Sequence, residues 1–163
     1  MKKIYVVRHA KSSWADLTIV DKERPLNSRG KRDAPVMAAW CKQHNYIPDF
    51  IITSTAKRAK ATSKIFAKVL GVPADSYISD DQLYHAPAEQ YMQSCYGLEE
   101  SENSVMLFGH NPGITYLANE VSQKYIENVA TCGILIIESS APNWQELAMD
   151  NCNLISYKAP KLI

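Results

Sequence analysis

The stretch Ile4-Tyr5-Val6-Val7-Arg8-His9-Ala10-Lys11-Ser12 determines the expected fold and the position of its site. Its four apolar residues, 4–7, predict a short buried β-strand. The strand runs directly into Arg8 and His9, so it presents a cation and a titratable ring at its carboxyl end. In open α/β sheets, ligands bind at that edge. We therefore expect a functional site where this strand ends.

Two later apolar runs end in a similar way. Residues 50–54 predict a second strand, which is followed by Arg58, and residues 105–109 predict a third, which ends at His110. The carboxyl ends of parallel strands meet at one edge of a sheet, so we expect these side chains to join those that end the first strand. Two guanidinium groups and two imidazoles are a set suited to binding a phosphoryl group.

The rest of the chain alternates between helical and strand patterns. This order predicts an α/β fold of three layers, with a mainly parallel central sheet, flanking helices and an antiparallel edge. No linker interrupts it, so we expect one domain over residues 1–163. The polar loop 12–27 is long enough to be functional or to contain short helical turns. The expected helices cover 28–44, 56–70, 88–98 and 113–122, and the further strands lie near 77–78 and at 134–138, 146–149 and 154–157.

Composition and charge exclude several classes of protein. The formal net charge of +1 gives no general attraction to nucleic acid or to acidic membranes, so we expect neither as a partner. Four widely spaced cysteines without a C-x-x-C pair predict free thiols in a reducing compartment. The apolar run after Met1 is too short for a signal peptide, and no stretch approaches the roughly 18 apolar residues of a membrane span. We expect a cytoplasmic protein.

Several motifs together resemble those of the histidine phosphatase superfamily, which includes the phosphoglycerate mutases. They are Arg8-His9-Ala10, the run from Ser54 to Thr62, and Gly109-His110-Asn111-Pro112-Gly113. The run from Arg24 to Gly30 is similar to a segment of the small SixA-type branch, whose members are phosphohistidine phosphatases. The resemblance covers residues 3 to about 138 and implies a phosphoglycerate mutase-like fold.

The resemblance also implies a role for each strand-end residue. His9 would attack phosphorus with a neutral ring nitrogen and form a phosphohistidine intermediate, which water then hydrolyses. Arg8 and Arg58 would hold the phosphoryl oxygens, and His110 would be a third donor as the imidazolium beside the dianion. We expect no metal and no other cofactor, because His9, His85 and His110 lack the paired spacing of metal ligands.

The group that protonates the leaving atom is harder to identify. Mutase-like relatives carry a glutamate in the region of residues 83–87, where this chain has His85, and an asparagine where it has Ala15. These departures disfavour a mutase. Asp21 and His85 are the candidates for a general acid or a substrate contact. Arg24, Ser12 and Asn111 are further candidates for substrate binding.

These observations predict a metal-independent phosphatase whose partner is a phosphorylated protein, such as a histidine-phosphorylated carrier domain, or a small phosphoester. A small-molecule phosphomonoesterase, a mutase-like enzyme and a non-catalytic phosphate-binding module are the alternatives. The intact His9 favours catalysis over mere binding. The missing acid and the short segments between strands favour phosphohistidine over a sugar phosphate, because an imidazole leaves more readily than an alkoxide.

Overall fold

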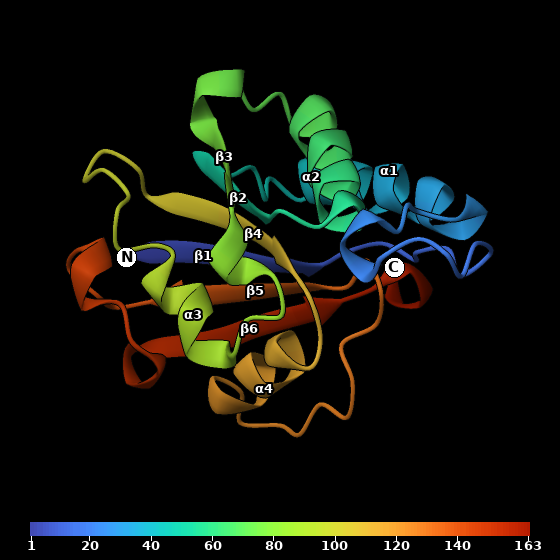
Figure 1. The fold of residues 1–163 in the computed structure, drawn as a ribbon. Coiled ribbons are helices and arrows are strands. Elements are labelled where there is room, and N and C mark those ends of the chain that lie inside the picture. The colour runs from blue at the N-terminus through green and yellow to red at the C-terminus, as the bar shows by residue number, and fades with distance from the viewer.

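The computed structural model describes all 163 residues and contains one six-stranded sheet, with strand order β3-β2-β4-β1-β5-β6. Helices α1 and α2 cover one face of the sheet and helices α3 and α4 cover the other, so the molecule has three layers (Figure 1). The strands are β1 Lys2–Arg8, β2 Phe50–Ser54, β3 Tyr77–Asp80, β4 Ser104–Gly109, β5 Ile134–Ser139 and β6 Cys152–Lys158. The helices are α1 Ser28–Gln43, α2 Lys57–Leu70, α3 Ala88–Gln93 and α4 Gly113–Glu120.

The sheet is parallel from β1 to β3 and antiparallel at the other edge. β1 pairs in parallel with β4, β4 with β2, and β2 with β3. β5 then runs antiparallel to β1, and β6 antiparallel to β5. This mixed α/β sheet confirms the expected fold class. It also places the carboxyl ends of β1, β2 and β4 side by side.

Alternation along β1 divides the core between the two faces of the sheet. Ile4 and Val6 pack in the cluster that includes α3 and α4, whereas Tyr5 and Val7 pack in the cluster that includes α1 and α2. All four side chains are almost completely buried. A strand buried on both faces is continuously apolar rather than alternating, as residues 4–7 are.

Local signals fix the two long helices where the sequence predicts them. The Asn27 side chain accepts a hydrogen bond from the backbone N–H of Gly30 and caps α1. Gly71 ends α2 with φ of 73°, the left-handed conformation that glycine adopts without strain. Pro35 lies inside α1.

Two expected elements differ from the structure. Helix α3 ends at Gln93 rather than near residue 98, and Ser94 instead donates a hydrogen bond to Asp80 at 2.8 Å. The strand expected over 146–149 is absent. Two 3-10 helices, 144–146 and 149–151, replace it, because the Asn151 side chain bonds the backbone of Ala148 and Glu146 and turns the chain.

The loop after β1 contains one short helical turn, as the sequence suggests. A 3-10 helix covers Asp21–Glu23, and an isolated bridge joins Ser12 to Leu26. All four cysteines are buried and free. None of the helices combines the length and apolarity that crossing a membrane requires.

Candidate active site

A hollow of about 250 Å³ lies at the carboxyl ends of β1, β2 and β4. All nine residues that the sequence predicts as site residues line it, together with Lys11, Trp14 and Thr131. Four cationic side chains and a single carboxylate face this space, so its electrostatic character favours an anion. The predicted residues are Arg8, His9, Ser12, Asp21, Arg24, Arg58, His85, His110 and Asn111.

His9 is buried in one defined tautomer. Its Nδ1 lies 2.7 Å from the carbonyl oxygen of Ala10, which can only accept, so Nδ1 carries the proton. The guanidinium of Arg58 donates from Nε to His9 Nε2 at 3.3 Å. Burial above all, with the charges of Arg58, Arg8 and Arg24, lowers the pKa of His9 to about 3, although the bond to Ala10 opposes this shift. The ring is therefore neutral, and its Nε2 lone pair accepts from Arg58, which also lines the hollow.

Two guanidinium groups flank His9 from different elements. Arg58, in the first turn of α2, is almost completely buried and donates to both the backbone and the carboxylate of Asp21. Arg8, at the end of β1, donates from Nη1 to the carbonyl of Val129 at 2.9 Å. Its buried Nε has no protein partner. A buried donor without an acceptor is costly.

His110 faces His9 across the hollow, with 5.2 Å between ring centroids. Its Nε2 lies 2.7 Å from the Ser54 hydroxyl, and its Nδ1 accepts from Arg58 at 3.4 Å. Burial, then the nearby His9 and Arg58, lower the pKa of His110 to about 2. The expected imidazolium is thus not the favoured form in the protein alone. A phosphate dianion beside the ring would favour the extra proton.

Asp21 is the one carboxylate of the hollow, and two of the cationic side chains donate hydrogen bonds to it. Its oxygens accept from Arg24, Arg58 and the Tyr84 hydroxyl, the last at 2.6 Å. Desolvation alone would raise the pKa of Asp21, but these hydrogen bonds and the charge of Arg58 hold it well below its usual range. Asp21 is therefore ionised and has no proton to donate, so the geometry favours a positioning role over that of a general acid.

Arg24 is held against the loop after β1. It donates to the Ser12 hydroxyl at 2.7 Å and to the carbonyl of Ser13 at 3.3 Å, and its guanidinium lies 3.6 Å from the centroid of the Trp14 ring. The side chain is almost completely buried. These contacts fix Arg24 at the mouth of the hollow, with Ser12 as its acceptor.

His85 lies at the opposite side of the mouth. Its side chain is 57% exposed, and its Nε2 is 3.4 Å from the carboxylate of Asp21. The ring packs beside Tyr84, with centroids 4.0 Å apart. The backbone of His85 is left-handed, with φ of 54°. The ring of His85 also lies near that of His110, with 5.7 Å between the centroids.

Asn111 lines the hollow but has no free amide atom. Its Nδ2 donates to the Asn128 side chain and to the carbonyl of Val129, and its Oδ1 accepts from Thr115. The same Val129 carbonyl accepts from Arg8. The amide of Asn111, predicted to contact substrate, is therefore hydrogen-bonded within the protein. It holds the segment around Val129, to which Arg8 donates.

Known proteins are similar to this chain in both sequence and structure. A sequence model of the histidine phosphatase superfamily (branch 1) matches residues 4–83, which include Arg8, His9 and Arg58. The SixA protein of Agrobacterium tumefaciens has a similar structure, with 28% identity, a TM-score of 0.80 and 98% of each chain covered. These matches support the histidine phosphatase superfamily as the family of this chain. Within it, the similarity is to the SixA-type branch.

Two further proteins are similar to this chain. The structure of the protein histidine phosphatase SixA in complex with tungstate shares the fold, with a TM-score of 0.81, 20% identity, and 98% of this chain and 97% of that one covered. An uncharacterized chloroplastic protein of Arabidopsis thaliana is 28% identical over 154 residues, which are 89% of this chain and 70% of the relative. The superfamily and the SixA neighbours support a hydrolase that removes phosphoryl groups.

The structure adds residues to this histidine phosphatase site that sequence reasoning did not select. Tyr84 immediately precedes His85, and that adjacency was the available signal. Trp14 and Lys11 line the hollow because of the path of the loop that follows β1. No group of three or more His, Cys, Asp or Glu side chains is arranged to hold a metal ion.

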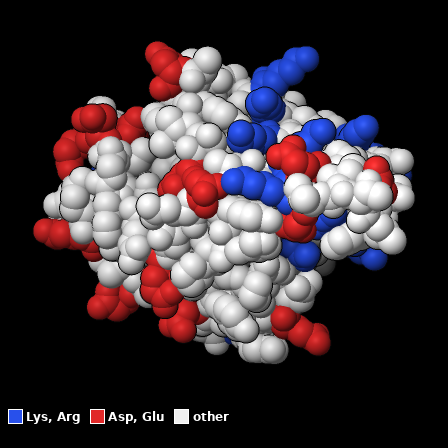
Figure 2. Space-filling view, viewed as in Figure 1, with Lys and Arg blue, Asp and Glu red and all other residues white.

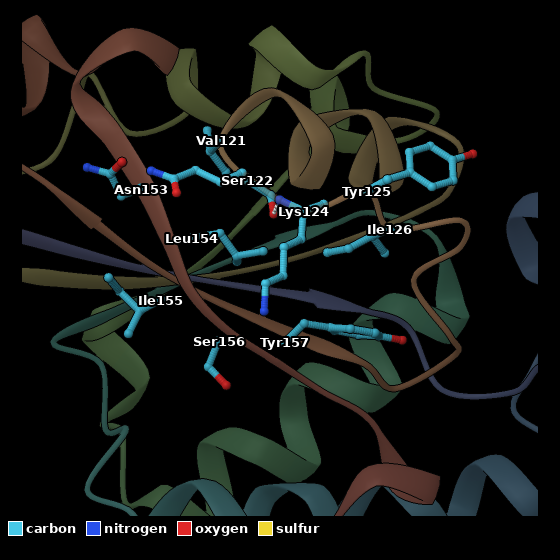
Figure 3. A pocket seen from close by; sticks show the side chains of 11 residues that line it. Val121, Ser122, Lys124, Tyr125, Ile126, Asn153, Leu154, Ile155, Ser156 and Tyr157 are labelled. Carbon is cyan, nitrogen blue, oxygen red and sulfur yellow. Dashed lines mark hydrogen bonds between the residues drawn. The ribbon is translucent and has the colours of Figure 1, made fainter.

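A larger hollow of about 760 Å³ lies elsewhere, between β6 and the segment 121–126 (Figure 3). Leu154 and Tyr157 of β6 lie on the same side of the strand as Lys124 and Ile126. Lys124 is the single cation of this hollow, and neither histidine nor arginine lines it. It therefore lacks the set of donors that a phosphoryl group requires.

Proposed function

We propose that this histidine phosphatase hydrolyses phosphohistidine on a partner protein, through a covalent phosphohistidine intermediate on His9 and without a metal ion. One observation carries the proposal: His9 is a buried neutral imidazole that lines a cationic hollow, with Arg58 donating to its Nε2. Such a ring can attack phosphorus without first losing a proton.

The surrounding donors fit the transferred phosphoryl group. Phosphoryl transfer spreads charge over the equatorial oxygens, so positioned cations supply most of the catalysis. Arg58 and Arg8 both line the hollow, from the first turn of α2 and from the end of β1. Asp21 orients Arg58 through its carboxylate and its carbonyl. These contacts hold the donors in place before the substrate arrives, which is what transition-state stabilisation requires.

The leaving group supports phosphohistidine as the substrate. Expelling an alkoxide requires a general acid, worth about 10²–10⁴-fold in rate. Asp21 is ionised, and His85, although it lines the hollow, is more than half exposed to solvent. A protonated imidazole can depart without such an acid. The A. tumefaciens neighbour, for which phosphohistidine phosphatase is itself a proposed activity, agrees with this substrate class.

The open mouth supports a protein as the carrier of the phosphoryl group. Trp14 is 62% exposed and the His85 side chain 57% exposed, so the two sides of the mouth are accessible to a folded partner. A side chain on a protein surface could therefore reach His9.

The test compares kcat/KM for a histidine-phosphorylated carrier domain, a phosphoserine peptide and 3-phosphoglycerate, each with a chelator and with added divalent cation. We expect the carrier domain to be turned over fastest, with no requirement for the cation, and the folded His9→Ala variant to be inactive. Equal turnover of phosphoserine or phosphoglycerate would show that the substrate assignment is wrong. A strict need for the cation would contradict the metal-independent mechanism.

A further inference from the structure

The loop that follows β1 is held by hydrogen bonds at its base, whereas its tip makes none to the sheet or the helices. Ser12 pairs with Leu26, and the backbone N–H of Ser13 donates to the carbonyl of Pro25 at 2.8 Å. Beyond this base, residues 14–20, the 14–20 loop, make hydrogen bonds only to residues between Ser13 and Glu23. The base of the loop is therefore fixed, and its tip has no hydrogen bonds to the sheet or the helices.

The 14–20 loop exposes three large apolar side chains within seven residues. Trp14 is 62% exposed, Leu17 83% and Val20 67%. Asp16 is the one charged residue in the segment. In Figure 2 the right side of the molecule, where Figure 1 places this loop, is a mainly uncharged projection bordered by charged side chains of both signs. An exposed apolar group of this kind is typical of an interaction surface.

This apolar surface is continuous with the catalytic hollow. Trp14 lines the hollow, and the guanidinium of Arg24, another lining residue, lies 3.6 Å from the Trp14 ring centroid. A phosphorylated side chain that reaches His9 from this side must pass Trp14. A small phosphoester would fill the hollow and leave Leu17 and Val20 in water, whereas a folded protein would cover both.

We propose that the 14–20 loop is the docking surface for the protein that carries the phosphoryl group, and that this partner presents an apolar face around its phosphohistidine. The inference rests on the proposed function. Trp14 is the anchor at the mouth, because Arg24 holds its ring on one face and the side chain stays largely exposed. Large rigid aromatic side chains next to a desolvated pocket commonly dominate such interfaces.

The first experiment separates docking from chemistry. The double variant Leu17→Ser/Val20→Ser removes apolar surface outside the hollow. We expect KM for the phosphorylated carrier domain to rise about tenfold, as for loss of an interface contact worth about 1.4 kcal/mol. kcat/KM for an aryl phosphate should be unchanged. Ile155→Ser, at a 55% exposed apolar residue on β6, is the matched control and should change neither value.

The second experiment measures binding without turnover. Trp144 is fully buried and Trp40 is half-buried, so Trp14 is the most exposed tryptophan. Adding the phosphorylated carrier to His9→Ala should shift the tryptophan emission to the blue, and His9→Ala/Trp14→Phe should lose that shift.

Distinct outcomes separate the two proposals. Failure of the parent protein to hydrolyse the carrier's phosphohistidine contradicts the proposed function, whereas the emission shift still reports on docking. An equal loss of kcat/KM for the carrier and the aryl phosphate in the double variant would contradict the proposed docking surface. An emission shift that survives Trp14→Phe would contradict it as well. A change in oligomeric mass with unchanged carrier kinetics would also overturn it, by assigning the loop to a second copy of the chain.

Discussion

At the residue scale, His9 and His110 are neutral because burial and nearby cations make a charged ring unfavourable. Each keeps a defined tautomer through its neighbours, since Ala10 accepts from His9 and Arg58 donates to both rings. The same neighbours that prepare His9 for attack therefore make folding depend on pH. An unfolded histidine has a pKa of about 6.5, so the unfolded chain binds more protons than the folded one below that pH.

This difference predicts that the free energy of unfolding decreases in acid. The two histidines give their full contribution above about pH 6.5, and it is lost as the pH falls toward their folded pKa values. Each contributes a slope of about 1.4 kcal/mol per pH unit in that window. Urea unfolding between pH 7 and 5, in phosphate-free buffer, measures it. In His9→Gln the slope of the free energy of unfolding against pH should fall by the contribution of one histidine. A parent protein that becomes more stable toward pH 5 would contradict the assignment of neutral rings.

At the scale of elements, the first turn of α1 packs directly on the loop that leaves His9. A Cβ atom on Gly30 would lie 2.2 Å from the backbone carbonyl oxygen of Lys11. Real Cβ atoms do not approach backbone this closely, so the helix or the loop would have to shift.

Gly30→Ala should therefore lower both stability and activity. We expect a loss of about 1–3 kcal/mol in the free energy of unfolding, as for overpacking, and a lower kcat for an aryl phosphate. Gly97→Ala is the matched control, because nothing lies within 4 Å of its added Cβ. Chemical denaturation and steady-state kinetics of both variants provide the comparison. If the two variants behave alike, the packing of α1 does not position the loop.

The elements that the sequence predicts correctly are those with continuous apolar runs or clear caps. Residues 4–7 form the centre of β1, and α2 ends at Leu70, immediately before Gly71, because both signals are local. The strand expected over 146–149 fails because side-chain bonds from Asn151, five residues beyond Glu146, turn the chain into 3-10 helices. A short apolar pattern carries no information about such bonds.

At the scale of the whole molecule, the hollow assembles from segments far apart in the sequence. Strand ends predicted that Arg8, His9 and His110 would meet, since parallel strands share an edge. The sequence could not predict that Trp14 lines the same space, because that depends on how the 14–20 loop folds back on Arg24. The same limit explains why the amide of Asn111 was expected to face substrate, although the structure places it against Val129.

The most direct measurement asks which atom receives the phosphoryl group. A reaction with an aryl phosphate is stopped in alkali during turnover, where phosphohistidine persists, and peptides are sequenced by mass spectrometry. We expect one phosphoryl group on His9 in the parent protein and none in His9→Ala, which should also be inactive. Phosphorylation of another residue, or full turnover by a folded His9→Ala variant, would contradict His9 as the nucleophile.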